Sequence, residues 1–214
     1  MTSDHWNRVW SDKDPATTSW FEAAPAAVAL IVAHTQPDDS IVDVGGGAST
    51  LVDGLLAADR GPITVLDVSG AALEIARRRL GVTATCVDWV VADVTRWHPA
   101  TRYALWHDRA VLHFLTDDAS VAAYARVAAD VVRPGGIAIV ATFADDGPEQ
   151  CSDLAVRRYT ESELSAVFGD DFVPESTDRF VHVTPWGAEQ RFVRVVLRRS
   201  VERSGSGAIS LPAS

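Results

Sequence analysis

Short apolar runs rich in valine and isoleucine alternate with longer segments of helical periodicity along the first two thirds of the chain. The runs are apolar at consecutive positions, so both faces of each corresponding strand are predicted to be covered. This pattern is typical of parallel strands that lie between helices. The predicted strands comprise residues 40–44, 62–68, 83–90, 102–107 and 136–143.

The segments between these strands predict helices over residues 50–58, 70–80 and 117–132. In the second segment, Leu73 and Leu80 recur at helical spacing. Strands and helices that alternate in this way predict an α/β fold with a doubly wound, Rossmann-like sheet. We expect that sheet to be mostly parallel and to carry helices on both faces.

The alternation changes after residue 143. A helix-like segment, 159–169, precedes two extended stretches, 171–183 and 188–199. Residues 184–187 join these stretches and contain a proline and a glycine, which suit a turn. The pattern therefore predicts an antiparallel C-terminal hairpin, which brings the sheet to seven strands.

The two ends of the chain differ from the part between them. Residues 1–37 are predicted to form a helical, aromatic lid, with a helix that begins near Pro25. A second interpretation places two of its tryptophans, four residues apart, on one face of a helix packed against the sheet. Residues 38–199 form the predicted main domain, and 200–214 are small, polar and aperiodic, which predicts a disordered tail. The aromatic residues of the lid are Trp6, Trp10, Trp20 and Phe21.

Composition narrows the classes of partner. The chain has 214 residues, of which 47% are hydrophobic, and a formal net charge of -10. An acidic protein is a poor match for a phosphate backbone, so nucleic acid is not expected as a partner. The sequence has no signal-peptide core and no apolar run long enough for a membrane helix, which predicts a cytoplasmic protein without a membrane partner. Cys86 and Cys151 are far apart and predict neither a disulfide framework nor a metal site.

A glycine cluster follows the first predicted strand, in the stretch IVDVGGGAST. Asp43 ends the strand, and Gly45, Gly46 and Gly47 precede the next helix. Glycines at such a junction permit positive φ angles and let a ligand contact the backbone. Tight packing of the strand against the helix is the alternative explanation of the cluster.

Two acidic residues later in the chain favour ligand binding over tight packing as the explanation of the glycine cluster. Asp67 ends the second strand, where a carboxylate can accept hydrogen bonds from both hydroxyls of a ribose. Asp93 ends the third, where it could accept from an adenine amino group beside the backbone of Val94. Either acid could instead cap the helix that follows it. A dinucleotide-binding loop is disfavoured because Thr50 stands at its third glycine position. A Walker phosphate-binding loop is excluded because no Gly-Lys-Ser/Thr motif follows the strand.

Five stretches in order resemble the motifs of class I S-adenosylmethionine-dependent methyltransferases: IVDVGGGAST, ITVLDVSGAALEIARRRL, VVADVTRW, YALWHDRAVLHFL and RPGGIAIVATF. The resemblance covers roughly residues 38–145. It implies S-adenosylmethionine as the cofactor and no metal. It also implies the following cofactor-binding residues: Asp43, Gly45, Gly46, Gly47, Asp67, Val68, Asp93, Val94 and the main chain of Asp108. One departure is Ser49, which replaces the third glycine of the family's usual loop.

The segment after the fourth strand is similar to the part of such enzymes that faces the transferred methyl group. It supplies the candidate catalytic residues His107, Asp108 and His113. Arg109, together with Trp20 and Phe21 of the predicted lid, is a candidate for contact with the acceptor. The alternatives are structural: His113 as a hydrogen-bonded helix residue and Asp108–Arg109 as an ordinary pair. For His182, on the predicted hairpin, a structural role is favoured.

The function predicted from these observations is methyl transfer from S-adenosylmethionine to a small-molecule acceptor, at nitrogen, oxygen or sulfur. The sulfonium methyl group is already activated, so the protein mainly has to align the reacting atoms and exclude water. Two alternatives stay open. The chain could methylate protein side chains, or it could bind the cofactor without catalysis.

Overall fold

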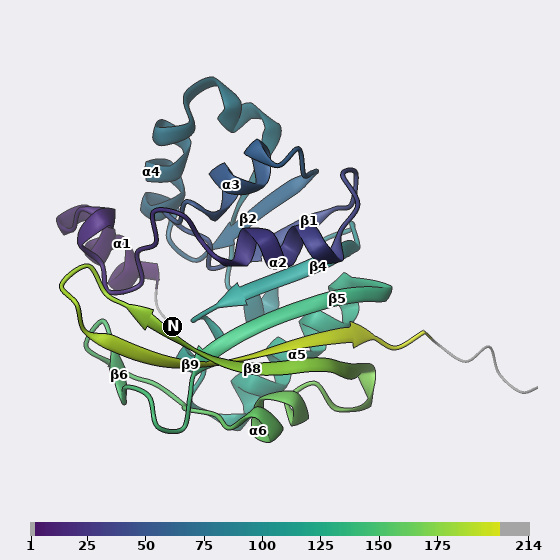
Figure 1. The fold of residues 1–214 in the computed structure, drawn as a ribbon. Helices are drawn as coiled ribbons and strands as arrows, with labels where there is room; N and C mark the ends of the chain where they lie inside the picture. Colours follow the sequence, from purple (N-terminus) through teal and green to yellow (C-terminus); the bar gives the residue numbers. More distant parts are fainter. Residues whose placement is uncertain (1–2, 202–214) are drawn as a thin grey trace, which may run out of the picture.

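A computed structural model describes residues 3–201, and its centre is a seven-stranded sheet (Figure 1). The strand order is β3-β2-β1-β4-β5-β9-β8. The first five strands in sequence run parallel, whereas β9 is antiparallel to both β5 and β8. The strands of this sheet are β1 Ile41–Val44, β2 Ile63–Asp67, β3 Val87–Val91, β4 Tyr103–Arg109, β5 Val132–Phe143, β8 Phe172–Val183 and β9 Glu189–Arg199. A separate two-stranded ribbon comprises β6 Gln150–Cys151 and β7 Leu154–Ala155.

Helices cover both faces of the sheet (Figure 1). On one face, Ile31 of α2, Leu55 of α3 and Leu73 of α4 pack in a single apolar core with residues of β1, β2 and β5. On the other, Tyr124 of α5 and Leu164 of α6 share a core with residues of β4, β5 and β9. The helices are α1 Ser3–Asp12, α2 Ala27–His34, α3 Leu51–Ala57, α4 Gly70–Leu80, α5 Asp118–Val131 and α6 Glu161–Ala166.

The structure confirms the predicted α/β fold, with its mostly parallel seven-stranded sheet and antiparallel C-terminal hairpin. One predicted strand is too long. Residues 83–86 belong to a 3-10 helix, Gly81–Cys86, and β3 begins only at Val87. The run contains β-favouring threonines and a cysteine, but Thr83, Thr85 and Cys86 are exposed, so this part of the run is not a buried strand.

The N-terminal segment places two of its tryptophans on one face of α1. Trp6 and Trp10 are both buried and form an apolar cluster with Ala48 and with Ala72 of α4. They therefore share one face of a helix, as the second interpretation expects, but that helix packs against α4 and not against the sheet. The same two side chains also line the cavity described below.

The predicted tail, residues 200–214, lies outside the described residues except for positions 200 and 201. Among residues 3–201, no helix has the length and apolar character needed to cross a bilayer.

Candidate active site

A cavity of about 260 Å³ opens at the carboxyl ends of β1 to β4. In a doubly wound sheet, this is the edge at which ligands bind. The predicted residues in its wall are Gly45, Asp67, Val68, Asp93, Val94, Trp20 and Arg109. Residues that the sequence did not single out complete the wall, notably Phe114 and Cys151.

The glycine loop leaves no room for a side chain at any of its three glycines, and at Gly45 a Cβ atom would lie 2.0 Å from Cγ2 of Val111. A Cβ atom on Gly46 would lie 2.3 Å from the Oδ2 atom of Asp43, so the loop backbone is in direct contact with that carboxylate. Gly47 has a φ of +43°, and a Cβ atom there would lie 2.9 Å from Oδ2 of Asp67. The loop thus approaches two predicted site carboxylates closely, and glycine is needed for that approach.

Ser49 fits the loop without strain, because it is not among the non-glycine residues with positive φ in the described part of the chain. Its hydroxyl accepts a hydrogen bond of 3.1 Å from the backbone N–H of Leu51, in the first turn of α3. Its carbonyl accepts from Arg79 at 2.6 Å. The serine that replaces the usual glycine therefore stabilises the start of α3.

We expect Ser49→Gly to lower the free energy of unfolding by about 0.5 kcal/mol, because glycine keeps the backbone but removes the hydroxyl acceptor. Urea unfolding followed by tryptophan fluorescence measures this change. Ser49 lines the smaller cavity described below, but its hydroxyl is engaged by Leu51, so the affinity for S-adenosylhomocysteine, the demethylated form of the predicted cofactor, should stay the same. A clear rise in that affinity would contradict this account of Ser49.

Asp67 is the most perturbed acid in the cavity wall. Its Oδ1 atom accepts a hydrogen bond of 2.8 Å from the backbone N–H of Ser69. Ser69, and not Asp67, caps α4, since its own hydroxyl accepts from Ala72 at 3.2 Å. Burial raises the pKa of Asp67 to about 7, although the bond from Ser69 opposes the shift. This carboxylate therefore lacks the donors that would stabilise its charge, which two ribose hydroxyls could supply.

Asp93 caps a short helix and also lines the cavity. Its side chain accepts from the backbone N–H of Thr95 at 2.9 Å and from the Thr95 hydroxyl at 2.7 Å, so it caps a short 3-10 helix, Val94–Arg96. It is also exposed and lines the cavity next to Val94. Capping uses only one carboxylate oxygen. The other is available to a ligand in the cavity.

Asp43 and His107 are neighbours in the register of β1 and β4. The Nδ1 atom of His107 lies 2.8 Å from Oδ1 of Asp43, and both side chains are buried. They line a smaller cavity of about 50 Å³ beside the glycine loop. Glu22 and Arg109 also line it, so two acidic and two basic side chains meet in this small space.

Asp108 is fully buried and lies outside both cavity walls. It accepts hydrogen bonds from the Tyr124 hydroxyl at 2.6 Å and from the backbone N–H groups of Val111 at 2.8 Å and Leu112 at 3.1 Å. Burial raises its pKa to about 6, and these donors limit the rise. The side chain holds the turn after β4, in which Ala110 has a φ of +77°.

His113 is buried between aromatic rings and is not part of either cavity wall. Its ring centroid lies 4.4 Å from that of Phe114 and 4.7 Å from that of Phe143. Neither ring nitrogen has a hydrogen-bond partner among the described residues, so the interpretation as a hydrogen-bonded helix histidine does not hold. Burial lowers its pKa to about 3, which keeps the ring uncharged at neutral pH.

Arg109 does not pair with Asp108. Its guanidinium donates to Oε1 of Glu22 at 2.7 Å and to the carbonyl of Trp20.

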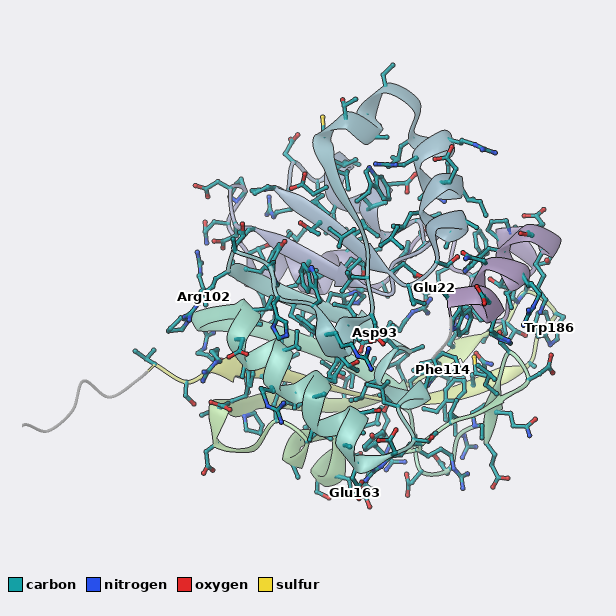
Figure 2. The ribbon with its side chains drawn as sticks, turned by 180° about the vertical axis from the view of Figure 1, so that it is seen from behind. Glu22, Asp93, Arg102, Phe114, Glu163 and Trp186 are labelled. Atoms are coloured by element: carbon teal, nitrogen blue, oxygen red, sulfur yellow. The ribbon has the colours of Figure 1, made fainter. Side chains whose placement is uncertain are left out.

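His182, on β8, donates from Nε2 to the carbonyl of Ser19 at 2.7 Å, and its Nδ1 lies 3.3 Å from Glu22. We call Glu22, Arg109 and His182 the clasp, because they tie residues 19–22 to β4 and to the hairpin. Figure 2 shows Glu22 on the same side of the molecule as α1.

Replacing Glu22 with glutamine should open the clasp. The change removes the charge that faces Arg109 and His182, and we expect it to lower the free energy of unfolding by about 1–3 kcal/mol. Chemical denaturation measures the loss. The matched control is Glu175→Gln, which breaks the exposed pair with Arg198 and should cost less than about 1 kcal/mol. Equal losses for the two variants would show that the clasp is an ordinary surface pair.

The remaining part of the cavity wall is aromatic. The ring of Trp6 packs edge-on against Phe114 at 5.0 Å and Trp20 at 6.2 Å, and Trp10 packs against Trp20 at 5.8 Å. Cys151, of the small β6–β7 ribbon, completes this side. Phe21 and Gly47, both predicted site residues, line neither cavity.

Comparison with known proteins decides the family. Residues 41–136 match a family model described as a methyltransferase domain. The chain carries a methyltransferase domain. This match confirms the predicted methyltransferase domain. Among curated protein sequences, none matches the chain.

Solved structures share the fold of this methyltransferase. One comes from work on the conversion of a disulfide bond into a thioacetal group during echinomycin biosynthesis, with a TM-score of 0.76, 20% identity and 93% of each chain covered. A second is the Burkholderia thailandensis 1,6-didemethyltoxoflavin-N1-methyltransferase with bound 1,6-didemethyltoxoflavin and S-adenosylhomocysteine (TM-score 0.67, 22% identity, 93% of this chain and 84% of that one). The N-methyltransferase NodS from Bradyrhizobium japonicum, in complex with S-adenosylhomocysteine, has a TM-score of 0.69 and 15% identity over 93% of this chain and 99% of its own.

Proposed function

We propose that the methyltransferase transfers the methyl group of S-adenosylmethionine to a small-molecule acceptor by in-line displacement. The observation that carries the proposal is the convergence of the glycine loop, Asp67 and Asp93 on one cavity, which the smaller charged cavity adjoins. This set matches the parts of the cofactor: an adenine, a ribose and an amino-acid tail.

The chemistry of each lining residue suggests which part of the cofactor it would contact. Asp93 and Val94 would hold the adenine edge, Val68 its face, and Asp67 the ribose hydroxyls. The amino-acid end carries one positive and one negative group. The small cavity beside the glycine loop offers both kinds of partner, the acids Asp43 and Glu22 and the bases His107 and Arg109.

The candidate catalytic residues are proposed to act by positioning. His107 lines the small cavity with Asp43, while Asp108 and His113 are buried beneath the cavity wall. None of the three lines the large cavity, so we assign them no proton transfer with the acceptor. They would fix the loop and the turn that carry the cofactor and the aromatic side of the wall.

A small acceptor is favoured because three tryptophans of the N-terminal segment line the aromatic side of the cavity and narrow the access to it. The Burkholderia enzyme, whose structure contains bound 1,6-didemethyltoxoflavin and S-adenosylhomocysteine, has a similar fold. Methylation of protein side chains would instead require a polypeptide to reach the cavity past Trp6, Trp10 and Trp20.

The test combines calorimetry with a labelling assay. We expect the purified protein to bind S-adenosylhomocysteine, and label from methyl-labelled S-adenosylmethionine to enter the small-molecule fraction of a cell extract. Label in polypeptides would favour the protein-methylating alternative. Binding without any transfer would favour the binding module, and absence of binding would overturn the proposed function altogether.

A further inference from the structure

The aromatic side of the large cavity limits what the acceptor can be. We propose that the acceptor atom is an uncharged nitrogen or thioether sulfur in a flat, largely apolar molecule, and that the methylated product is an onium cation. This inference rests on the proposed function and names the substrate class of the same site. It follows from the ionisable groups and the rings of the wall.

No free general base faces this part of the cavity among the described residues. The carboxylates of the wall, Asp67 and Asp93, stand at the ends of β2 and β3, on the cofactor side. The remaining acidic group is the Cys151 thiol, and burial raises its pKa to about 11, so it stays protonated. An alcohol or a protonated amine needs a base before it can attack, whereas a neutral amine or a thioether does not.

An anionic acceptor is disfavoured for a separate reason. A carboxylate, phenolate or thiolate also attacks without a base, but a buried anion needs a cationic partner. Arg109 is the cation on this side of the wall, and its guanidinium already faces Glu22 at 2.7 Å. Arg96 also lines the cavity, but it is exposed and stands beside Asp93 on the cofactor side. The acceptor side therefore presents no uncompensated positive charge within the described residues.

The rings supply what a developing cation needs. Trp6, Trp10, Trp20 and Phe114 line the cavity and contact one another edge-on, an arrangement that fixes their orientation. Aromatic faces attract cations, and tryptophan does so most strongly. A flat acceptor would also pack against these rings while it is still uncharged.

Methyl transfer to an uncharged acceptor atom balances in charge without a general base. The lone pair of the acceptor forms a bond to the methyl carbon, the carbon–sulfur bond of the sulfonium breaks, and its electron pair stays on sulfur. S-adenosylhomocysteine leaves as a neutral thioether at the reacting sulfur, and the positive charge moves to the acceptor atom. No proton is transferred in the cavity, so the missing base is not required.

The experiment measures binding to the protein saturated with S-adenosylhomocysteine. The probes are quinoline, N-methylquinolinium, dimethyl(1-naphthyl)sulfonium and 2-naphthoate, titrated by calorimetry at high salt to screen the net negative charge of the protein. We expect quinoline and at least one cation to bind, with the tighter cation binding about tenfold more strongly than the naphthoate anion. The tighter of the two cations identifies nitrogen or sulfur as the acceptor.

Two variants test whether the aromatic rings of the cavity wall bind the cations. Trp20→Ala should weaken cation binding about fivefold or more. Trp186→Ala, at the exposed turn of the hairpin and 62% exposed, is the matched control and should change nothing (Figure 2). Tighter binding of naphthoate than of either cation, or no binding of any probe while S-adenosylhomocysteine binds normally, would overturn the inference. Failure to bind S-adenosylhomocysteine would instead overturn the proposed function.

Discussion

Replacing Asp67 with alanine is expected to weaken binding of S-adenosylhomocysteine by about 1–3 kcal/mol, the range for a lost hydrogen bond to a charged group. The carboxylate lines the cavity, and its Oδ1 atom accepts a hydrogen bond from the backbone N–H of Ser69. Ribose hydroxyls would therefore meet an oxygen that the protein leaves available. Calorimetry measures the change, and unaltered affinity would remove Asp67 from the proposed ribose site.

The same residue predicts a pH dependence of binding. In the ligand-free protein, burial raises the pKa of Asp67 to about 7, so the carboxyl group takes up a proton as the pH falls through that value. Hydrogen bonds from a ribose favour the ionised form, so binding should release a proton below pH 7. Affinity should then fall with decreasing pH, by at most about tenfold per pH unit.

Two variants separate ionisation from other effects of the substitution. Asp67→Asn keeps the shape of the side chain but cannot ionise, so its affinity should not change between about pH 5 and 8. Asp88→Ala removes an exposed carboxylate from β3, away from the cavity wall, and should leave both affinity and its pH profile intact. A pH profile that persists in the Asn variant would assign the titration to another group.

The architecture could be predicted because it follows local patterns. Consecutive apolar residues identify buried parallel strands, and the extended stretches around residues 184–187 identify the hairpin. The one overlong strand, at residues 83–86, shows the limit of that rule. These residues form an exposed 3-10 turn. The prediction fails here because the residue pattern alone does not show whether another element covers the segment.

The cofactor side of the site could be predicted for a similar reason. Strand ends in a parallel sheet lie at one edge, so Asp67 and Asp93 had to come close to the glycine loop. The acceptor side depends on contacts between distant segments. Arg109 pairs with Glu22, 87 positions away, and His182 bonds to Ser19, 163 positions away. No local pattern marks such partners, and Cys151 joins the wall through a loop after β5 that has no periodicity.

Replacing Asp108 with alanine is expected to lower the free energy of unfolding by about 3 kcal/mol or more. The substitution leaves three donors without their acceptor in a fully buried place: the Tyr124 hydroxyl and the N–H groups of Val111 and Leu112. Each unsatisfied buried donor costs about 1–3 kcal/mol, less where water enters. Urea unfolding measures the loss.

A double-mutant cycle shows whether the loss comes from this network. Tyr124→Phe removes one donor and should cost about 1 kcal/mol alone, because the hydroxyl also accepts from Nε1 of Trp106 at 3.0 Å. In the Asp108→Ala background it should cost clearly less, since the hydroxyl has already lost its acceptor. Because the turn held by Asp108 carries Arg109 and leads to Phe114, the alanine variant should also bind S-adenosylhomocysteine more weakly. Additive losses, with cofactor binding unchanged, would mean that Asp108 neither orders this turn nor supports the cavity wall.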